Sequence, residues 1–563
     1  MKFINSISYK PRLFTSLKTY NKEKFFADLL SGIIVGIVAL PLAIAFGIAS
    51  GVSPEKGVIT AIVAGFLISF FGGSDVQIGG PTGAFIVIVY GIVQQFGERG
   101  LIIATLMAGI MLLLMGISKL GSVIKFIPYP IVVGFTSGIA LTIFSTQIND
   151  FFGLGMTNIP SEFIPKWIAY FQNFSNINYA NLGVALASLL IIIFMPKISK
   201  KIPGSLVAIV VLTVGVFFLN KYNIFGIQIE TIGNRYTIDP NLPKPTAPKI
   251  DFAAMKLLFP AAFSIAMLGA IESLLSATVA DGVTGKKHDS NTELIGQGIA
   301  NIICPLFGGI PATGAIARTM TNINNGGKTP VAGIIHAVVL LLILLFLGSL
   351  TKYIPMACLA AILIIVSYNM SEWRTFKSLL KNPVHDVIVL LLTFFLTVIF
   401  DLTVAIQIGL LIAAVLFMKR VYDTSKISVI TNAVDVNQEI DVKSNEEKLI
   451  LPEDVEVYEI DGPFFFGIAN KLEEVMSLRD KKPHIRIVRM RKVPFIDSTG
   501  IQNLKALYRS SKQSKIKVIL SGVNDDVLKA LVNSGFADEI GMENICSHID
   551  QAVAKAWELE GKL

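Results

Sequence analysis

Charged residues are scarce in this chain, and their scarcity is the first guide to its class. Lys, Arg, Asp and Glu make up 16% of its 563 residues, whereas soluble globular proteins carry about 25%. Hydrophobic residues make up 53% of the chain, and the mean hydropathy is +0.65. This composition excludes an ordinary soluble protein of this length. It predicts a polytopic membrane protein surrounded by a lipid bilayer.

Cysteine and histidine are also few. The three cysteines, Cys304, Cys358 and Cys546, lie far apart without metal-ligand spacing, and the five histidines are equally scattered. We therefore expect no disulfide framework, no structural metal and no cofactor. No nucleophile–base pair or phosphate-binding loop is recognisable, so an enzyme is not expected. The net charge of +8 lies mainly in short connections between apolar runs, which indicates membrane orientation and no binding of nucleic acid.

Residues 1–26 lack the apolar core and small-residue cleavage site of a signal peptide, and they are predicted to form a cytoplasmic lead-in along the membrane surface. The transmembrane domain is expected at 27–420, with about fourteen apolar spans, including two short ones that begin near residues 81 and 313. An even count places both ends on one side, and Lys and Arg concentrate in connections on that side. The positive-inside rule then predicts a cell-membrane protein with both termini in the cytoplasm.

Two apolar segments are unusual. They are QIGGPTGAFIVIVYGIV at 77–93 and IPATGAIARTMTNINNGGKTP at 310–330. Each opens with glycine and proline, and each is too short for a full span of about 20 apolar residues, so each predicts a helix that begins partway through the bilayer. The first amides of a helix have no partner within it and attract anions. Because Arg318 lies near the start of the second helix, we expect one wall of an anion site there.

The chain also repeats itself weakly. LGSVIKFIP at 120–128 matches LGSLTKYIP at 347–355, and GGPTGA at 79–84 resembles GGIPATGA at 308–315. The two matches occur in the same order and at nearly the same offset, which is not expected by chance.

Repeats of about seven spans, at 27–220 and 257–420, would enter the membrane in opposite orientations. Inverted repeats place paired broken helices with their starts facing each other near the midplane. Residues 81–84 and 311–315 are therefore expected to converge.

The composition changes after Arg420. Residues 421–446 are polar and predict a linker that can contain one strand, and 447–563 has the alternation of a soluble α/β domain. Strands are expected at 454–460, 484–490 and 516–521, and helices near 466–479, 498–512, 523–534 and 546–559. The sequence FIDSTG, at 495–500, lies between a strand and a helix.

Several of these stretches together resemble the SulP anion transporters, the sulfate permease family. They are ALPLAIAFGIASG at 39–51, GGPTGAFIVIV, LGAIESLLSATVADGVTGKKHDSNTELIGQGIAN at 268–301, PATGAIARTMTNINNGGKTP and the DSTG motif. The resemblance covers nearly the whole chain. It implies about fourteen spans in two inverted repeats, arranged as a core and a gate, followed by a cytoplasmic STAS domain. It also implies transport of a small inorganic anion by a homodimer.

The candidate anion-binding residues lie on the two broken helices and the first span. Threonine hydroxyls and bare backbone amides could meet an anion there, and helix capping with tight packing is the alternative. Arg318 supplies permanent charge or balances an acid within the bundle; the resemblance favours the anion role, because anion-exchanging relatives carry arginine here. Phe46 faces the site or only packs. The candidates are Phe46, Thr82, Gly83, Ala84, Thr313, Gly314, Ala315 and Arg318.

Glu272 lies deep in an apolar span, where an unpaired carboxylate is costly. It is predicted to be the proton or sodium site, with an ion pair to Arg318 as the alternative. The resemblance implies an acid here and, in sodium-coupled bicarbonate carriers, a hydroxyl one turn later, which would be Ser276. Two helix starts of about +0.5 each, Arg318 and ionised Glu272 sum to about +1. A bound proton or Na⁺ would raise the sum to about +2, which matches sulfate.

Sulfate, taken up with H⁺ or Na⁺ by alternating access, is therefore the first expectation. Leu42 stands where many sulfate carriers of the family have glutamine, and the 39–51 stretch is closer to the bicarbonate branch. Arg318 is evidence against that branch, because its members can lack this arginine. Bicarbonate, chloride and dicarboxylates stay open as substrates. The sequence is also compatible with an uncoupled anion channel or a membrane-bound signalling protein.

Ser498, in the DSTG motif, stands where bacterial anti-sigma antagonists are phosphorylated. Capping of the following helix is the alternative. The STAS domain is expected to serve trafficking, dimer contacts or the binding of a regulatory protein, and not catalysis.

Overall fold

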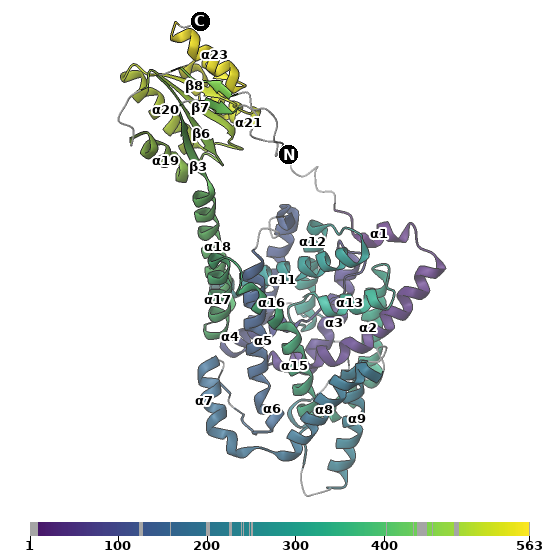
Figure 1. The fold of residues 1–563 in the computed structure, drawn as a ribbon. Coiled ribbons are helices and arrows are strands. Elements are labelled where there is room, and N and C mark those ends of the chain that lie inside the picture. Colours follow the sequence, from purple (N-terminus) through teal and green to yellow (C-terminus); the bar gives the residue numbers. More distant parts are fainter. Residues whose placement is uncertain are drawn as a thin grey trace. The chain divides into compact units, whose positions relative to one another are not determined.

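The structure is a computed structural model that describes residues 9–561, apart from 123–127, 158, 161, 199–202, 224–227, 238, 240, 242, 247, 249–251, 401, 432, 436–447, 453 and 478–482. The chain divides into two compact units, Met1–Ala413 and Ala414–Leu563 (Figure 1). The first unit is helical, and the second is built on a sheet. Helix α18 (Leu402–Thr424) crosses the boundary between them.

Apolar helices make up the first unit. Nine helices in the described ranges are long and apolar enough to cross a membrane, and α17 is a shorter apolar one. The predicted count of about fourteen spans stays a prediction. The helices that matter below are α2 (Lys22–Ala49), α3 (Pro54–Phe71), α4 (Ile86–Ile117), α5 (Tyr129–Thr146), α8 (Tyr179–Ile198), α9 (Gly204–Lys221), α11 (Phe252–Thr284), α12 (Ser290–Ile303), α13 (Ile316–Asn324), α14 (Val331–Leu347), α15 (Met356–Met370), α16 (Trp373–Leu379) and α17 (Val384–Ile399).

Glycine marks where the helices break. The backbone of Gly97 has φ +66 and ψ −174, so α4 is two helices joined at a kink. Such a backbone conformation is open to glycine and strained for other residues.

The second copy of the short repeat, at 347–355, forms a 3₁₀ helix over Gly348–Tyr353. In the first copy, residues 123–127 lie outside the described residues.

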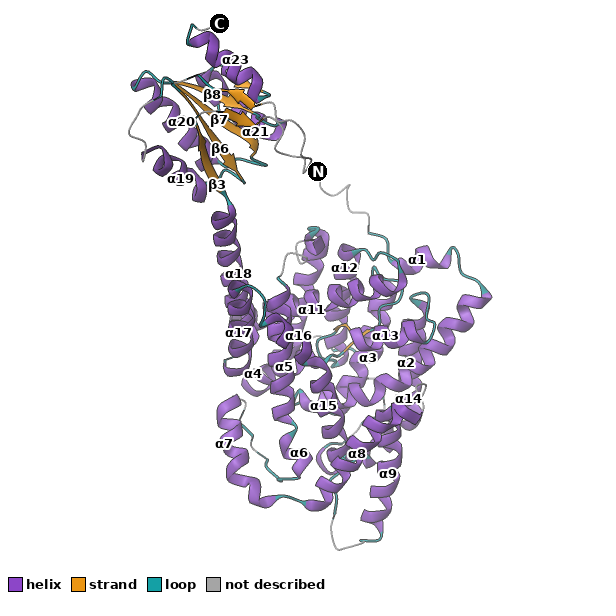
Figure 2. Cartoon of the chain, viewed as in Figure 1, coloured by secondary structure: helices purple, strands orange, loops and turns teal. Residues whose placement is uncertain are grey.

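The helices of this unit pack in two groups. In one group α3 packs on α2, α12 and α14, α14 also packs on α2, and α4 packs on α12 and α11, which in turn packs on α13 (Figure 2). In the other group α5 packs against α15 and α17, and α8 packs against α9 and α15. The first group contains both broken helices, as expected of a core, and the second group corresponds to the expected gate.

The second unit contains a five-stranded sheet in the order β3-β6-β7-β8-β9. Edge strand β3 (Lys426–Ile430) is antiparallel to β6 (Val455–Asp461), whereas β7 (Ile485–Lys492), β8 (Lys517–Ser521) and β9 (Ile545–Cys546) continue in parallel. Helices α19 (Phe466–Ser477), α20 (Ser498–Gln513), α21 (Asp525–Asn533) and α23 (Ile549–Leu559) match the predicted ones closely.

The predicted linker at 421–446 contains a strand, as the sequence analysis allowed. Strand β3 lies inside 421–446, and it is an integral edge strand of the sheet, paired with β6 over five residues. Its side chains are only partly buried, because an edge strand covers one end of the core, so the segment looks as polar as a linker in the sequence.

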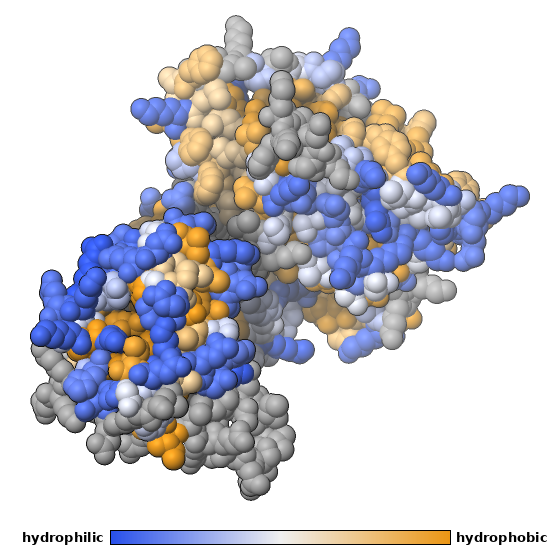
Figure 3. Space-filling model, turned by 90° about the horizontal axis from the view of Figure 1, so that it is seen from above, coloured by the Kyte–Doolittle hydropathy of each residue, from blue (hydrophilic) through white to orange (hydrophobic). Residues whose placement is uncertain are grey.

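Figure 3 shows the hydropathy of one face of the molecule. Hydrophilic side chains gather on the visible end of the helical unit, and hydrophobic ones appear toward its margins. Along the flanks, large apolar side chains such as Phe217, Leu342 and Phe395 are exposed, as expected for a surface in contact with lipid.

Candidate functional site

The two broken helices meet through a short pair of strands inside the helical unit. Strand β1 (Gly79–Gly80) pairs antiparallel with β2 (Thr313–Gly314), with Gly79 opposite Gly314 and Gly80 opposite Thr313. Figure 2 shows this pair as the small orange element among the helices. A 3₁₀ turn (Gly83–Phe85) leads from β1 into α4, and α13 follows β2. The structure therefore brings the two predicted segments together.

Arg318 lies in the first turn of α13 and is only 2% exposed. Its Nη2 donates a hydrogen bond to the carbonyl oxygen of Pro81, on the opposite broken helix. Its Nη1 has no partner among the described residues. A buried guanidinium with a free donor is costly unless a further acceptor is supplied. Arg318 thus joins the two helix starts and keeps one donor available.

Gly80 makes room for this guanidinium. A Cβ atom at this position would lie 2.2 Å from Arg318 Nη1, and Gly80 has φ +149. Both facts require glycine here, since a side chain would collide with the arginine and strain the backbone.

Neither threonine caps a helix. The Thr82 hydroxyl is buried and has no hydrogen-bond partner in the described part of the chain. The Thr313 hydroxyl bonds to the carbonyl oxygen of Gly269, and it lies 2.6 Å from the Ser273 hydroxyl. Neither side chain caps a helix, but the packing part of the alternative describes Thr313, whose hydroxyl is already bonded within the protein. Thr313 ties β2 to α11, whereas Thr82 has an unused hydroxyl.

The amides of Gly314 and Ala315 are already bonded, which corrects one expectation. Gly314 N–H donates to Ser273 Oγ at 3.1 Å, and Ala315 N–H donates to the carbonyl oxygen of Ile78 at 2.9 Å. These two residues anchor the turn and do not offer bare amides. The amides that the start of α13 leaves without a helical partner are those that follow, from Ile316 onward.

Phe46 lies beside the other helix start. It is 5% exposed, and its ring lies 3.6 Å from where a Gly83 Cβ would stand. Met370 of α15 and Ile143 of α5 approach the same point, at 2.8 and 3.4 Å. Ala84 is fully buried next to it. The first broken helix therefore begins at a place where both helix groups meet.

Glu272 lies on α11, next to Ser273, and its side chain is half-buried. It forms no hydrogen bond or ion pair with any described residue, so the alternative of a structural pair with Arg318 does not hold. Ser276 donates to Thr319 Oγ1 at 3.3 Å, and Thr319 in turn accepts from the amide of Ile78. The carboxylate is left available, and the serine is part of the scaffold around β1.

A buried carboxylate that the sequence analysis did not single out supports β1. Glu293 of α12 is fully buried and accepts hydrogen bonds from Gly73 N–H, Gln77 Nε2 and Gln297 Nε2 at 2.7–2.8 Å. Gln77 also donates to the carbonyl oxygen of Ser273. The sequence did contain a signal for this contact, because Glu293 and Gln297 are one helical turn apart and their side chains can therefore bond to each other.

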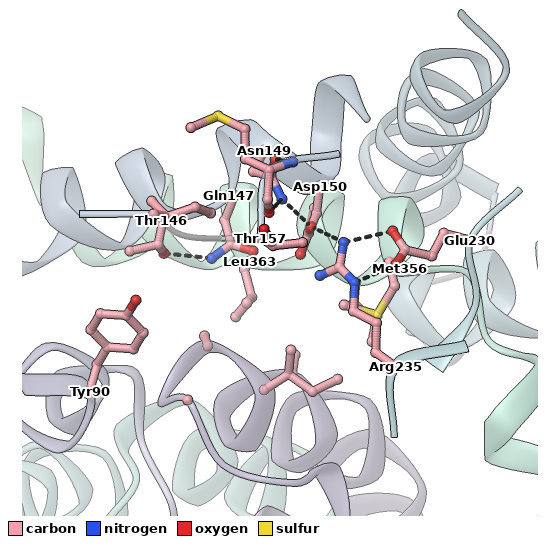
Figure 4. A pocket seen from close by; sticks show the side chains of 18 of the residues that line it. Tyr90, Thr146, Gln147, Asn149, Asp150, Thr157, Glu230, Arg235, Met356 and Leu363 are labelled. Carbon is pink, nitrogen blue, oxygen red and sulfur yellow. Dashed lines mark hydrogen bonds and ion pairs between the residues drawn. The ribbon is translucent and has the colours of Figure 1, made fainter. Parts of the chain in front are cut away.

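A cavity of about 410 Å³ lies at the end of the helical unit where α2 ends. Ala45 on α2, Leu363 on α15 and Tyr90 on α4 line it, so it separates the two helix groups. Figure 4 shows Arg235 between the carboxylates of Asp150 and Glu230, with Tyr90 at the other end of the space. Ala45, on the cavity wall, precedes Phe46, so the cavity and the candidate anion site border consecutive residues of α2.

Ser498 is exposed at the first position of α20, and it does not cap that helix. Asp497 is the N-cap residue, with Oδ1 accepting from Gly500 N–H at 2.7 Å. The capping alternative for Ser498 is therefore wrong, because the aspartate before it already fills that position.

Two broken helices that face each other within a bundle of membrane-spanning helices are the arrangement of secondary transporters. Here a buried arginine with a donor that has no partner among the described residues lies between the two helix starts, as an anion site would require. The helical unit thus belongs to a class of anion carriers, with an α/β domain attached.

The chain belongs to the sulfate permease family. Residues 25–393 match the model of the sulfate permease family, and residues 449–556 match the STAS domain. It is accordingly a multi-pass membrane protein and an anion transporter of the SulP/SLC26 type, not an enzyme.

Relatives carry two substrate names. YvdB of Bacillus subtilis strain 168, whose naming as a sulfate transporter is provisional, is 42% identical over 95% of this chain and 98% of its own. The bicarbonate transporter BicA of Picosynechococcus strain PCC 7002 is 34% identical over 79% of each chain.

Solved structures agree on the fold. The transmembrane domain of a cyanobacterial BicA is 31% identical and superposes with a TM-score of 0.62, covering 70% of this chain and 98% of that one. Murine Slc26a9, solved in the inward-facing state, is 18% identical with a TM-score of 0.86, over 99% of this chain and 95% of that one. The second likeness concerns the fold alone.

Proposed function

We propose that the chain carries sulfate across the cell membrane by alternating access, driven by H⁺ or Na⁺. The observation that carries this proposal is the pair of unused donors at the two helix starts. Arg318 Nη1 and the Thr82 hydroxyl are both buried, and both lack a partner among the described residues. An oxyanion bound there would accept from both and would lie at the positive ends of two helices.

The unpaired carboxylate of Glu272 supports coupling to a cation. With Glu272 ionised, the two helix starts and Arg318 leave a net charge of about +1, and a bound proton or Na⁺ raises it to about +2. Sulfate is then best matched only when the coupling ion is present. This makes cotransport a consequence of charge balance.

Movement of one helix group against the other would expose the site alternately. Phe46 and Gly83 belong to the first group, whereas Met370 and Ile143 belong to the second and close over Gly83. We infer that both termini are cytoplasmic and that the protein is a homodimer. With cytoplasmic termini, the cavity near Ala45 would open to the outside of the cell. Closure at Met370 and Ile143 would then separate this cavity from the bound anion.

Bicarbonate is the second candidate substrate, and the observation that favours it is the identity with relatives named as bicarbonate transporters. Bicarbonate carries one charge, so it would suit the site with Glu272 ionised, at a sum of about +1.

Uptake by purified protein in liposomes tests these proposals. Labelled sulfate, bicarbonate, chloride and fumarate are offered in turn, with Na⁺ and H⁺ gradients imposed separately. We expect sulfate to accumulate only when one of the two gradients is present. Gradient-driven accumulation of bicarbonate alone would select the second candidate. Movement of any anion without response to either gradient would indicate a channel, and no movement of any of them would contradict transport.

A further inference from the structure

The cavity near Ala45 contains a buried cation that the anion site does not use. Lys166 lies on α7 (Phe163–Asn173), which is not among the helices long enough to span a membrane. Its side chain lines the cavity and is only 2% exposed. Its ammonium group forms no hydrogen bond or ion pair with any described residue. A buried ammonium without a counter-ion is unfavourable, so the position is suited to binding an anion.

A second unused donor lies one turn away on the same helix. The Tyr170 hydroxyl is buried, lines the same cavity and has no partner in the described ranges. Gly155 and Thr157, also on the cavity wall, are exposed, so the cavity reaches the surface on that side. A solute can therefore approach Lys166 from the solvent.

The other charged groups of the cavity are Arg235 and two carboxylates, which sum to a formal charge of −1 and make the described wall neutral once Lys166 is included. Arg235 bonds to Asp150 at 2.8 Å and to Glu230 at 2.5 Å (Figure 4). The remaining titratable groups on the wall are the phenols of Tyr90, Tyr170 and Tyr236, which are neutral near pH 7. Lys166 is thus the one cation of the described wall without a carboxylate partner.

We propose that this cavity is an entrance site, in which Lys166 and Tyr170 bind the inorganic oxyanion before it reaches Arg318. The site would hold a small anion such as sulfate, and its role as an entrance rests on the transport function proposed above. Ala45 lines the cavity and the next residue, Phe46, lies beside Gly83, so the two sites border consecutive residues of α2.

The entrance site should depend on pH on its own side of the membrane. Burial lowers the pKa of Lys166 to about 8. The ammonium is charged below this pH and neutral above it, so sulfate is held at lower pH and released as the pH rises through about 8. Sulfate itself does not titrate in this range. The KM for sulfate should therefore rise between about pH 7 and pH 9 on that side.

Two substitutions of Lys166 test this in liposomes with sulfate as substrate. Lys166→Met should raise the KM about tenfold at neutral pH and leave kcat nearly unchanged. Lys166→Arg should keep the low KM and remove its rise with pH. The matched control is Lys56→Met, because Lys56 is paired with Glu98 and does not line the cavity. An unchanged KM in Lys166→Met would overturn the proposal.

A binding measurement separates this proposal from the transport function. Trp167 adjoins Lys166, and replacing the other two tryptophans (Trp373→Phe, Trp557→Phe) makes its fluorescence a local reporter. Sodium sulfate should change that fluorescence in a saturable way. The change should persist with Arg318→Ala and disappear with Lys166→Met. If this pattern holds while no anion is transported, the proposed function fails and the binding site stands. A sulfate response that survives Lys166→Met contradicts the site.

Discussion

The chemistry of this carrier depends on where one guanidinium finds its acceptors. A charge at this depth costs at least about 2.5 kcal/mol without compensation. The carbonyl of Pro81 offsets part of that cost for Arg318, and no carboxylate of the described residues pairs with it. The anion proposed to bind here would supply the remaining compensation, and it would then link the stability of the site to its occupancy.

Gly80→Ala should reduce transport sharply. The added Cβ would fall 2.2 Å from Arg318 Nη1, and φ +149 is strained for alanine. Strain of about 1–3 kcal/mol at this point should displace the guanidinium and lower sulfate uptake by about tenfold to hundredfold. Initial uptake rates in liposomes measure this. Gly91→Ala is the control, since nothing lies within 4 Å of its added Cβ. Normal uptake by Gly80→Ala would show that the position of Arg318 is not critical.

Glu272→Gln should uncouple transport from the ion gradient. Glutamine has the shape of the protonated acid, so the charge sum stays near +2 without a coupling ion. Sulfate binding should therefore persist, while uptake no longer responds to the H⁺ or Na⁺ gradient. Equilibrium binding and gradient-driven uptake are measured on the same preparation. If the variant still accumulates sulfate in response to a gradient, Glu272 is not the coupling residue.

At the scale of elements, β1 is held by side chains from helices far away in the sequence. Its approach, residues 72–78, has few side chains that could pack by themselves, and Glu293, Thr319 and Asn322 bond to its backbone. The broken helix of the first repeat is therefore positioned by α12 and α13, and its precision depends on them.

Glu293→Gln should destabilise the protein. The buried carboxylate accepts hydrogen bonds from Gly73 N–H and from two glutamine side chains. In the variant, the NH₂ group of the new side-chain amide would face one of these N–H donors, and neither could accept a hydrogen bond. Leaving such a buried group unsatisfied costs about 1–3 kcal/mol. We expect a lower midpoint of thermal unfolding and weaker sulfate uptake. Glu98→Gln, which removes only a surface ion pair, should leave the midpoint nearly unchanged. Equal midpoints for both variants would exclude a structural role for Glu293.

At the scale of the whole molecule, the sequence predicted what local pattern determines. Long apolar runs gave the helices, alternation gave the strands of the second unit, and glycine with proline gave the two broken helices. The antiparallel register of β1 with β2 and the contact of Ser273 with Thr313 could not be predicted, because they depend on how distant helices pack. The cavity around Lys166 was missed for the same reason, since its wall comes from several separate parts of the chain.

The division into two units predicts that the helical unit binds the anion without help from the STAS domain. Each unit has its own buried core, and all contacts described around Arg318 and Thr82 come from residues within Met1–Ala413.

A chain that ends at Thr424 keeps α18 whole and removes the sheet from β3 onward. We expect this shortened protein to remain folded, by circular dichroism and gel filtration, and to take up sulfate with a KM within about threefold of the full chain, a difference below about 1 kcal/mol. The maximal rate and the oligomeric state can change, because these are the properties that a regulatory domain would govern. A folded shortened protein with a KM raised tenfold or more would show that the second unit shapes the anion site directly.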